Sequence, residues 1–463
     1  MRLIRSRVPA LWVALLALFV FAGRTPAQLT INLSYQDVGV GFNDPTNGPT
    51  RQATMTAAAN AIASQLDARG TINIRFDPSN TQTGVGFLGQ MGTLFIQQNG
   101  FSNGLVYQRA TTNSTPFGPP DGTGQFNFAS DIQWNNTTFP PTQNQFDLFS
   151  VAFHEFTHAL GFSSRIEATG QGAQGNTLGS QDNYSDYDRF IKRGSSNQFL
   201  ITSSAAFNTA GASPSDLISN DLFFDGPITK AANNGNPVKV FAPNPFNPAS
   251  SVSHVDPSVA NNAVMLPALP NGTSRRTYLN FEIAMLIDLG WNTFSWNSTP
   301  GNWADNVSST TNARWQNIDN QNILSPVGTI TPNVVLKFGG TTFSQYTSTN
   351  NLPANPFQVM RVVLDSISNF TNTIDGNRLQ FGTSIGVQPQ IQQNNIAAFN
   401  INTPITTTAP GLELTGTGTG VVTLGGVIDG SGAINKTGTS VFTLSGANAY
   451  TGNTTVTAGT LQM

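Results

Sequence analysis

The chain has 463 residues but no cysteine, only three histidines, and few charged side chains, which make up 10% of the total. Without cysteine, neither a disulfide framework nor a thiolate metal site can form. The formal net charge of −3 excludes the strongly basic surface of a nucleic-acid-binding protein, so we expect no nucleic-acid partner. Any transition-metal site must therefore be built from histidine and carboxylate side chains.

Residues 1–27 have the composition of a secretory signal peptide. Three arginines at positions 2, 5 and 7 precede an apolar stretch from Ala10 to Ala22, and Thr25-Pro26-Ala27 resembles a cleavage site. The apolar stretch is short for a bilayer span, so an N-terminal anchor is the weaker alternative. No later segment is apolar enough to cross a membrane. We expect an exported protein, either secreted or associated with the cell surface.

Residues 28–295 alternate between strand and helix patterns and predict an α+β domain with helices packed on a twisted sheet. Apolar and polar residues alternate in residues 29–35 and again in residues 72–76, as in half-buried strands. Between them, residues 52–69 carry apolar side chains at helical spacing, and Gly70 follows as a helix terminator.

Two further segments precede the most informative motif. Glycines at positions 84, 86, 89 and 92 predict a loop that leads to an apolar run at residues 94–96. This loop lacks the lysine and the helix start of a phosphate-binding loop, so we assign it no nucleotide role. Residues 126–134 alternate as a half-buried strand, and if that strand borders a cleft, a peptide substrate could add to it.

The motif is His154-Glu155-Phe156-Thr157-His158. On a helix, positions i and i+4 lie on the same face, so the two imidazoles can bind one metal ion while Glu155 acts as a base beside it. The alternative is a helix with two packed histidines. Asp147 is the expected N-cap of this helix, and Gly161 is the expected left-handed residue after its last turn.

A catalytic zinc ion usually has three protein ligands, so a third must come from elsewhere. His254 is the only other histidine in the chain. Glu282 is the competing candidate, since it lies in a second amphipathic helix expected over residues 277–289. Met265 lies between them, and on its own pattern it is equally an ordinary core methionine.

This order of motifs resembles the metzincin metalloproteases, which have a zinc helix ending in glycine, a third histidine and a methionine turn. Ser164 occupies the position of the third ligand in the compact signature, so the resemblance is to the leishmanolysin (gametolysin-related) branch, in which an insertion precedes the third histidine. The resemblance implies a zincin-like fold with one catalytic Zn²⁺. It makes His154, His158 and His254 the metal ligands, Glu155 the catalytic base, and Met265 the Met-turn residue.

The activity implied is hydrolysis of protein or peptide substrates by a zinc-activated water, with Glu155 as general base. Tyr278 or Arg276 are candidates to stabilise the oxyanion, although the sequence places neither of them. In the insertion, Asp182, Asp186 and Asp188 could bind calcium, but their spacing fits no known calcium loop. A solvated turn packed by its aromatic residues is the preferred interpretation.

The composition changes after Trp291. Residues 296–410 are β-rich and low in charge, and predict an accessory or linker region. In residues 411–463, Val421-Val422-Thr423-Leu424-Gly425-Gly426 is echoed by Val441-Phe442-Thr443-Leu444-Ser445-Gly446. This end of the chain resembles the autotransporter-associated β-strand repeat of bacterial surface proteins. Short strands with Gly/Asn turns at regular intervals predict a β-helix, with a β-sandwich as the alternative.

Two classes of function remain. The first is a secreted zinc endopeptidase with a β-rich accessory region. The second is a structural or adhesive surface protein whose protease-like domain is inactive. The presence of His154, Glu155, His158 and His254 together favours the enzyme.

Overall fold

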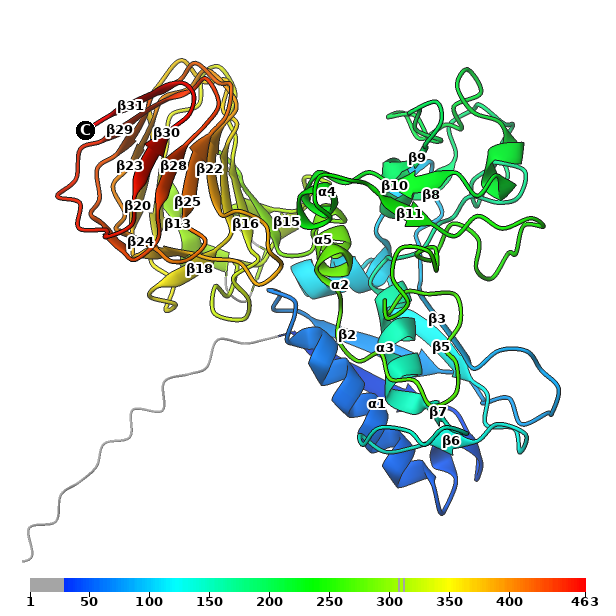
Figure 1. Cartoon of the computed structure of the whole chain (residues 1–463). Helices are drawn as coiled ribbons and strands as arrows, with labels where there is room; N and C mark the ends of the chain where they lie inside the picture. The colour runs from blue at the N-terminus through cyan, green and yellow to red at the C-terminus, as the bar shows by residue number, and fades with distance from the viewer. Residues whose placement is uncertain (1–28, 307–308, 311–312) are drawn as a thin grey trace, which may run out of the picture.

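The computed structural model describes residues 29–306, 309–310 and 313–463. The predicted signal peptide lies outside these ranges. The described chain has mixed helix and strand composition, and it forms two parts that lie side by side (Figure 1). Residues 29–292 form a part with helices and strands, and residues from Thr293 onward form a stack of short strands. No helix among the described residues combines the length and apolar character that a bilayer crossing requires.

The first part is built on a four-stranded sheet with the order β1-β2-β5-β3. Strands β1 (Thr30–Tyr35), β2 (Thr71–Phe76) and β5 (Gly122–Phe126) are parallel, and β3 (Gly89–Thr93) is antiparallel at the edge. The alternation predicted for β1 and β2 is confirmed, because alternate side chains of β2 are fully buried. In β1, every second side chain is exposed and the side chains between them are half-buried.

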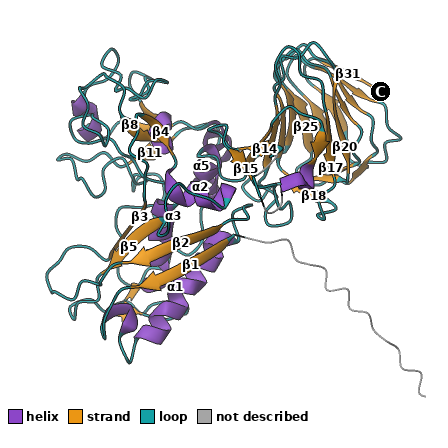
Figure 2. Cartoon of the chain, turned by 180° about the vertical axis from the view of Figure 1, so that it is seen from behind, coloured by secondary structure: helices purple, strands orange, loops and turns teal. Residues whose placement is uncertain are grey.

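Helices α1 (Gly48–Ala63) and α3 (Leu148–Ala159) pack against each other and cover one face of the sheet (Figures 1 and 2). The first expected helix is present, but it ends at Ala63 and not at Arg69, because Gln65 and Leu66 continue only as a tight turn. A short helix that the pattern did not reveal, α2 (Gly104–Thr112), follows β4 (Gly100–Ser102).

The expected order of strands near the cleft was wrong in two places. Gly89 and Gly92 lie within β3, not in a loop, and the apolar run at residues 94–96 follows directly after this strand. Residues 126–134 do not form one strand either, since β5 ends at Phe126 and β6 (Trp134–Asn135) pairs only with β7 (Phe146–Asp147). The edge strand beside the cleft is therefore β3.

The long insertion after α3 is rich in loops, as expected, and forms a small lobe of its own. The chain then returns through helix α5 (Asn280–Asp288), which lies within the predicted range. The α-helix and strands of the insertion are β8 (Asn183–Ser185), β9 (Ile191–Arg193), β10 (Leu222–Phe224), α4 (Pro227–Ala232) and β11 (Val238–Val240).

The second part is a stack of coils whose strands, from residue 335 onward, pair in parallel with the strands of the next coil. Residues 315–316 and 322–323, at the start of the first sheet, pair antiparallel. Parallel pairing on three sides is typical of a β-helix, and it excludes the antiparallel β-sandwich. The parallel coils run without a break from residue 335 to residue 462. The strands of the first sheet are β12 (Thr293–Trp296), β14 (Trp315–Gln316), β15 (Asn322–Ile323), β16 (Val335–Phe338), β19 (Arg361–Leu364), β22 (Gln390–Gln393), β25 (Leu412–Thr415), β28 (Ile434–Lys436) and β30 (Thr454–Val456).

Two more sheets complete the coils. The second contains β13 (Gly301–Asn302), β17 (Thr347–Asn350), β20 (Asn372–Gly376), β23 (Phe399–Ile401), β26 (Val422–Leu424), β29 (Val441–Leu444) and β31 (Thr460–Gln462). The third contains β18 (Phe357–Val359), β21 (Leu379–Phe381), β24 (Ile405–Thr407) and β27 (Ile428–Gly430). Val422 pairs with Phe442 in the register, so the sequence echo corresponds to one coil.

The two parts share a continuous interface. Asp67 accepts hydrogen bonds from the backbone amides of Val327 and Gly328, and Arg69 donates to the carbonyls of Ser325 and Pro326. Helix α5 lies between the two cores. One of its faces packs into the first part, while Ala284 and Ile287 contact a cluster from the coils that contains Val335, Met360, Ile385 and Val387.

Candidate metal centre

Helix α3 and a distant loop bring the three histidines of the chain together. The Nε2 atoms of His154 and His158 are 3.1 Å apart, and each lies 3.2 Å from the Nε2 atom of His254. These atoms form a nearly equilateral triangle. A tetrahedral zinc ion with nitrogen ligands about 2.0–2.1 Å away would set those nitrogens about 3.3 Å apart. The three side chains therefore fit the ion that the sequence implies.

The hydrogen bonds of the other ring nitrogens fix the tautomers. The Nδ1 atoms of His154, His158 and His254 lie 2.7–2.8 Å from the backbone carbonyl oxygens of Val264, Phe162 and Ser250, respectively. A carbonyl can only accept, so each Nδ1 carries the proton of a neutral imidazole. All three Nε2 lone pairs then face one another with no proton between them, an arrangement that a cation stabilises.

The imidazoles are held in the neutral form that metal binding requires. Burial lowers the pKa of His158 to about 4, and burial together with the nearby His158 lowers the pKa of His254 to about 3. Burial and the two neighbouring histidines lower the pKa of His154 well below its usual value.

The turn after α3 supplies one of the three carbonyls. Gly161 has a φ of +97°, its amide donates to the carbonyl of His158, and the next amide, that of Phe162, donates to Thr157. This is the Schellman arrangement of a helix C-terminus, as the sequence predicted from Gly161. The same turn directs the Phe162 carbonyl back to the His158 ring.

Glu282 does not join the histidines. Its carboxylate accepts hydrogen bonds from the amides of Met265 and Leu279, at 2.8 and 2.9 Å, and it is fully buried. It therefore holds the turn at Val264-Met265, whose Val264 carbonyl orients His154. Met265 is fully buried, and its carbonyl accepts from the amide of Val255, the residue after His254. Met265 thus lies in a turn that connects two of the three histidine segments.

Glu155 lies beside the histidines, 6% exposed, with its side chain against β3. Burial raises its pKa to about 8, while a hydrogen bond with the Met91 backbone acts in the opposite direction. A nearby dication would favour the ionised form, in which this carboxylate can act as a base.

The helix that carries these residues begins as expected, with one difference. Asp147 is the N-cap, but its carboxylate makes no cap hydrogen bond to the first-turn amides. It accepts instead from the Ser150 hydroxyl and from the guanidinium of Arg276. Arg276 is therefore engaged at the start of α3, away from the cleft.

A cleft of about 660 Å³ opens over the histidines and Glu155. Its walls are residues 86–91, which include the start of β3, and loop residues on either side of His254 and Met265. Tyr278 does not line the cleft, because its hydroxyl hydrogen-bonds the Thr157 hydroxyl at 2.6 Å. The cation that does line the cleft is Arg275, whose guanidinium donates to the carbonyls of Ala268 and Asn261. Nothing in the sequence distinguished it from Arg276.

The three aspartates of the insertion do not converge on one point. Asp182 accepts from the amides of Gly172, Gln174, Asn176 and Asn183, while Asp188 caps a turn through Ser185 and Asp186 pairs with Arg189. All three are buried, so the turn is not solvated, although its aromatic residues Tyr184 and Tyr187 are packed as expected. Among the described residues, only the three histidines form a group that could hold a metal ion.

Comparison with known proteins found one similarity, at the C-terminus. The family model of the passenger-associated transport repeat matches residues 434–463. These residues form strands β28 to β31. No curated protein and no solved structure matched the chain. The repeat is associated with autotransporters, and it supports a secreted or cell-surface location.

Proposed function

We propose that this protein is a secreted zinc-dependent endopeptidase of the metzincin type. The observation that carries the proposal is the triangle of three Nε2 atoms. Each Nε2 has a free lone pair, because the Nδ1 of the same ring carries the proton and donates it to a backbone carbonyl. Three nitrogen ligands and one open side facing a cleft are typical of a catalytic zinc site, whereas structural sites have four protein ligands.

Each group of the site has a separate role in the proposed reaction. His154, His158 and His254 would hold the ion, which when bound polarises a peptide carbonyl and makes a water molecule more acidic. Glu155 takes a proton from the attacking water and returns it to the leaving amine. The carbonyls of Val264, Phe162 and Ser250 keep the imidazoles in the ligating orientation.

Strand β3 provides a backbone on which a peptide can lie. The amide of Leu94 donates to Asp121 and the carbonyl of Leu88 accepts from Asn127, so the even-numbered residues of this strand face β5. In an antiparallel ladder, Gly89, Met91 and Thr93 then direct their backbone groups to the free edge, where the Met91 amide already donates to Glu155. An extended substrate can pair there as an added strand.

Metal analysis combined with a digestion assay tests the proposal. The purified protein should contain one zinc ion per chain and cleave casein, and a chelator should abolish cleavage. Glu155→Ala should retain zinc but lose at least about 100-fold in turnover, because only the base is removed. His254→Ala should lose both the bound zinc and the turnover. A wild-type protein that binds no zinc would contradict the assignment.

The alternative is a structural or adhesive surface protein, favoured by the coil stack and the C-terminal repeat match. Stoichiometric zinc with no cleavage of any peptide, by the wild type and Glu155→Ala alike, would support this alternative.

A further inference from the structure

A second pocket is lined by residues that follow those of the metal cleft along two stretches of chain. Residues 86–91 line the metal cleft, and residues 93–95 line a pocket of about 380 Å³. On the other side, Ser163 and Ser164 line the cleft, and Arg165 lines the pocket. The two hollows are therefore consecutive along both of these segments.

The pocket is mostly apolar. Its walls include Leu94, Phe95, Leu105, Phe117 and Pro120. Phe117 is 59% exposed and Leu94 is 38% exposed, so the pocket presents apolar surface to solvent.

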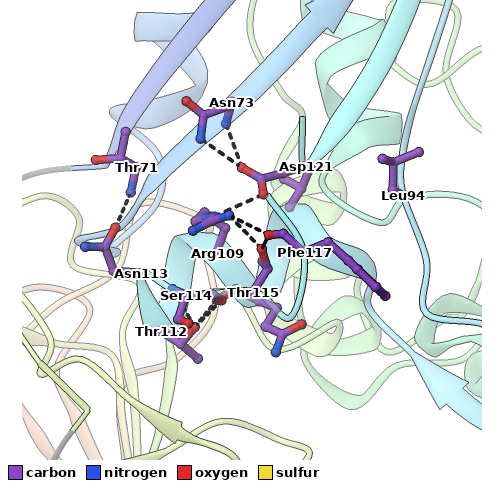
Figure 3. Close-up of polar contacts among 12 residues, drawn as sticks. Thr71, Asn73, Leu94, Arg109, Thr112, Asn113, Ser114, Thr115, Phe117 and Asp121 are labelled. Carbon is purple, nitrogen blue, oxygen red and sulfur yellow. Dashed lines mark hydrogen bonds and ion pairs between the residues drawn. The ribbon is translucent and has the colours of Figure 1, made fainter. Parts of the chain in front are cut away.

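An ion pair and several hydrogen bonds hold the loop that carries Phe117 (Figure 3). Arg109 pairs with the buried carboxylate of Asp121 and donates to the Thr115 hydroxyl and the Phe117 carbonyl. Asp121 also accepts from the amide and the side chain of Asn73. The Phe117 side chain projects from this loop on the side where Leu94 lies (Figure 3). These interactions therefore fix the backbone that carries the exposed Phe117 ring, and the pocket is preformed.

Arg165 adds one polar group. Its guanidinium stacks on the Phe95 ring, 4.1 Å from the centroid, and its backbone amide donates to Asp188. Its Nη1 atom is shielded from solvent and has no hydrogen-bond partner among the described residues. Asp188 and Asp182 lie within electrostatic range and partly offset its charge. A donor beside an apolar pocket suits an apolar group with a carboxylate next to it.

We propose that this pocket is a distal recognition site for the peptide substrate, which selects an apolar side chain flanked by an acidic one. The inference rests on the proposed peptidase function. Leu94 and Phe95 follow Met91, at the catalytic carboxylate, by three and four residues, or about 10–13 Å of extended chain. A peptide added antiparallel to β3 places the residues N-terminal to the scissile bond beside Thr93 and Leu94. The selected side chain is therefore about the third or fourth on that side.

Binding can be measured separately from catalysis. The full-length Glu155→Ala protein is titrated with fluorescent extended peptides that carry Phe-Glu, Ser-Glu or Phe-Gln at these positions. The Ser-Glu peptide should bind at least about tenfold more weakly, because an apolar side chain leaves the pocket. The Phe-Gln peptide should bind about threefold more weakly, since the partly exposed Arg165 contributes little. The same order should appear in kcat/KM with the wild-type protein.

Matched variants locate the effect. In Phe117→Ser, the preference for Phe over Ser should shrink towards one, and in Arg165→Gln the preference for Glu over Gln should disappear. Phe343→Ser, which alters an 87% exposed ring on the coil stack, should keep both preferences. Arg75→Gln, at an exposed ion pair, is the control for charge.

The outcomes separate the two proposals. Zinc-dependent cleavage with equal binding of the three peptides would overturn the distal site and leave the peptidase intact. Selective binding without cleavage by the wild type would overturn the peptidase and keep a peptide site in the pocket. Displacement of the Phe-Glu peptide by a free fatty acid, without any peptide preference in kcat/KM, would identify the pocket as a site for apolar carboxylates and overturn the proposal.

Discussion

At the scale of single residues, the metal centre depends most directly on the backbone. The three carbonyls that orient the imidazoles belong to Val264, Phe162 and Ser250, whose side chains take no part in those hydrogen bonds. The rarity of histidine in the sequence predicted which three rings would meet. The carbonyl partners could not be predicted, because every residue carries a carbonyl and only the folded turns place these three.

Gly161 is the clearest test of this dependence. Gly161→Ala should destabilise the protein by about 1–2 kcal/mol, because a side chain is unfavourable at a φ of +97°. Displacing the Phe162 carbonyl should also weaken zinc binding about tenfold. Thermal unfolding and competition with a chromophoric chelator measure the two effects. Gly339→Ala is the control, since this glycine has no positive φ and nothing within 4 Å of an added Cβ. Unchanged zinc affinity in Gly161→Ala would contradict the role of the turn.

The buried imidazoles also predict a pH dependence for the metal-free protein. An unfolded histidine has a pKa of about 6.5, whereas burial lowers that of His254 to about 3 and that of His158 to about 4. Below pH 6.5 the unfolded chain therefore binds protons that the folded chain does not. The stability is fully present above pH 6.5 and falls as the pH drops towards 4.

The measurement is denaturant unfolding of chelator-treated protein at pH 7 and pH 5. The loss on acidification should be on the order of 1 kcal/mol smaller in His254→Gln than in the wild type, because one titrating ring is gone. The comparison with a variant is needed because Glu155 and Glu282, whose pKa values burial raises, change stability in the opposite direction. Equal losses in both proteins would show that His254 is not buried as described.

At the scale of elements, sequence patterns succeeded where periodicity was strong. Helix α3 has a nearly continuous apolar surface, and its position was predicted to within a residue. Strand β3, Gly-Gln-Met-Gly-Thr, has no strand signal of its own. It is held by pairing with β5 along its whole length, with Gly122 and Gly124 allowing close packing. Tertiary pairing decided this strand, and local propensity did not.

Helix α5 packs against both parts of the chain. A substitution on the face that contacts the coils therefore tests how much the two parts stabilise each other. Ile287 is 3% exposed and contacts the coil cluster. Ile287→Ala should lower the free energy of unfolding by about 2–4 kcal/mol, because it leaves a cavity between the two cores. Chemical denaturation monitored by tryptophan fluorescence measures this change. Ile367→Ala, at a 45% exposed position on the coils, should change it by less than about 0.5 kcal/mol.

At the scale of the whole molecule, the coil stack is longer than its visible repeats. The sequence echo covers only the last coils, because earlier coils share strand geometry without sharing residues. Their cores use different side chains, among them Trp296, Trp303 and Trp315 at the start of the stack. Such coils bury only neighbouring surfaces, so backbone pairing and apolar alternation are enough to specify each one.

Removal of the coil stack should destabilise the first part. A chain that ends at Asn292 exposes Ala284 and Ile287 and leaves the buried carboxylate of Asp67 without the amides of Val327 and Gly328. We expect a lower unfolding temperature and binding of an apolar dye, measured against the full chain. A truncated protein with the unfolding temperature of the full chain would show that the interface adds no stability.

The junction between α5 and β12 is buried along its length. Leu289, Trp291 and Asn292 are all at most 3% exposed, and the Trp291 indole donates to the carbonyl of Leu160 at the end of α3. The buried junction therefore connects the coils directly to the helix that carries Glu282. Because Glu282 accepts from the Met265 amide and the adjacent Val264 carbonyl orients His154, a shift of this helix would also move the carbonyl that orients His154.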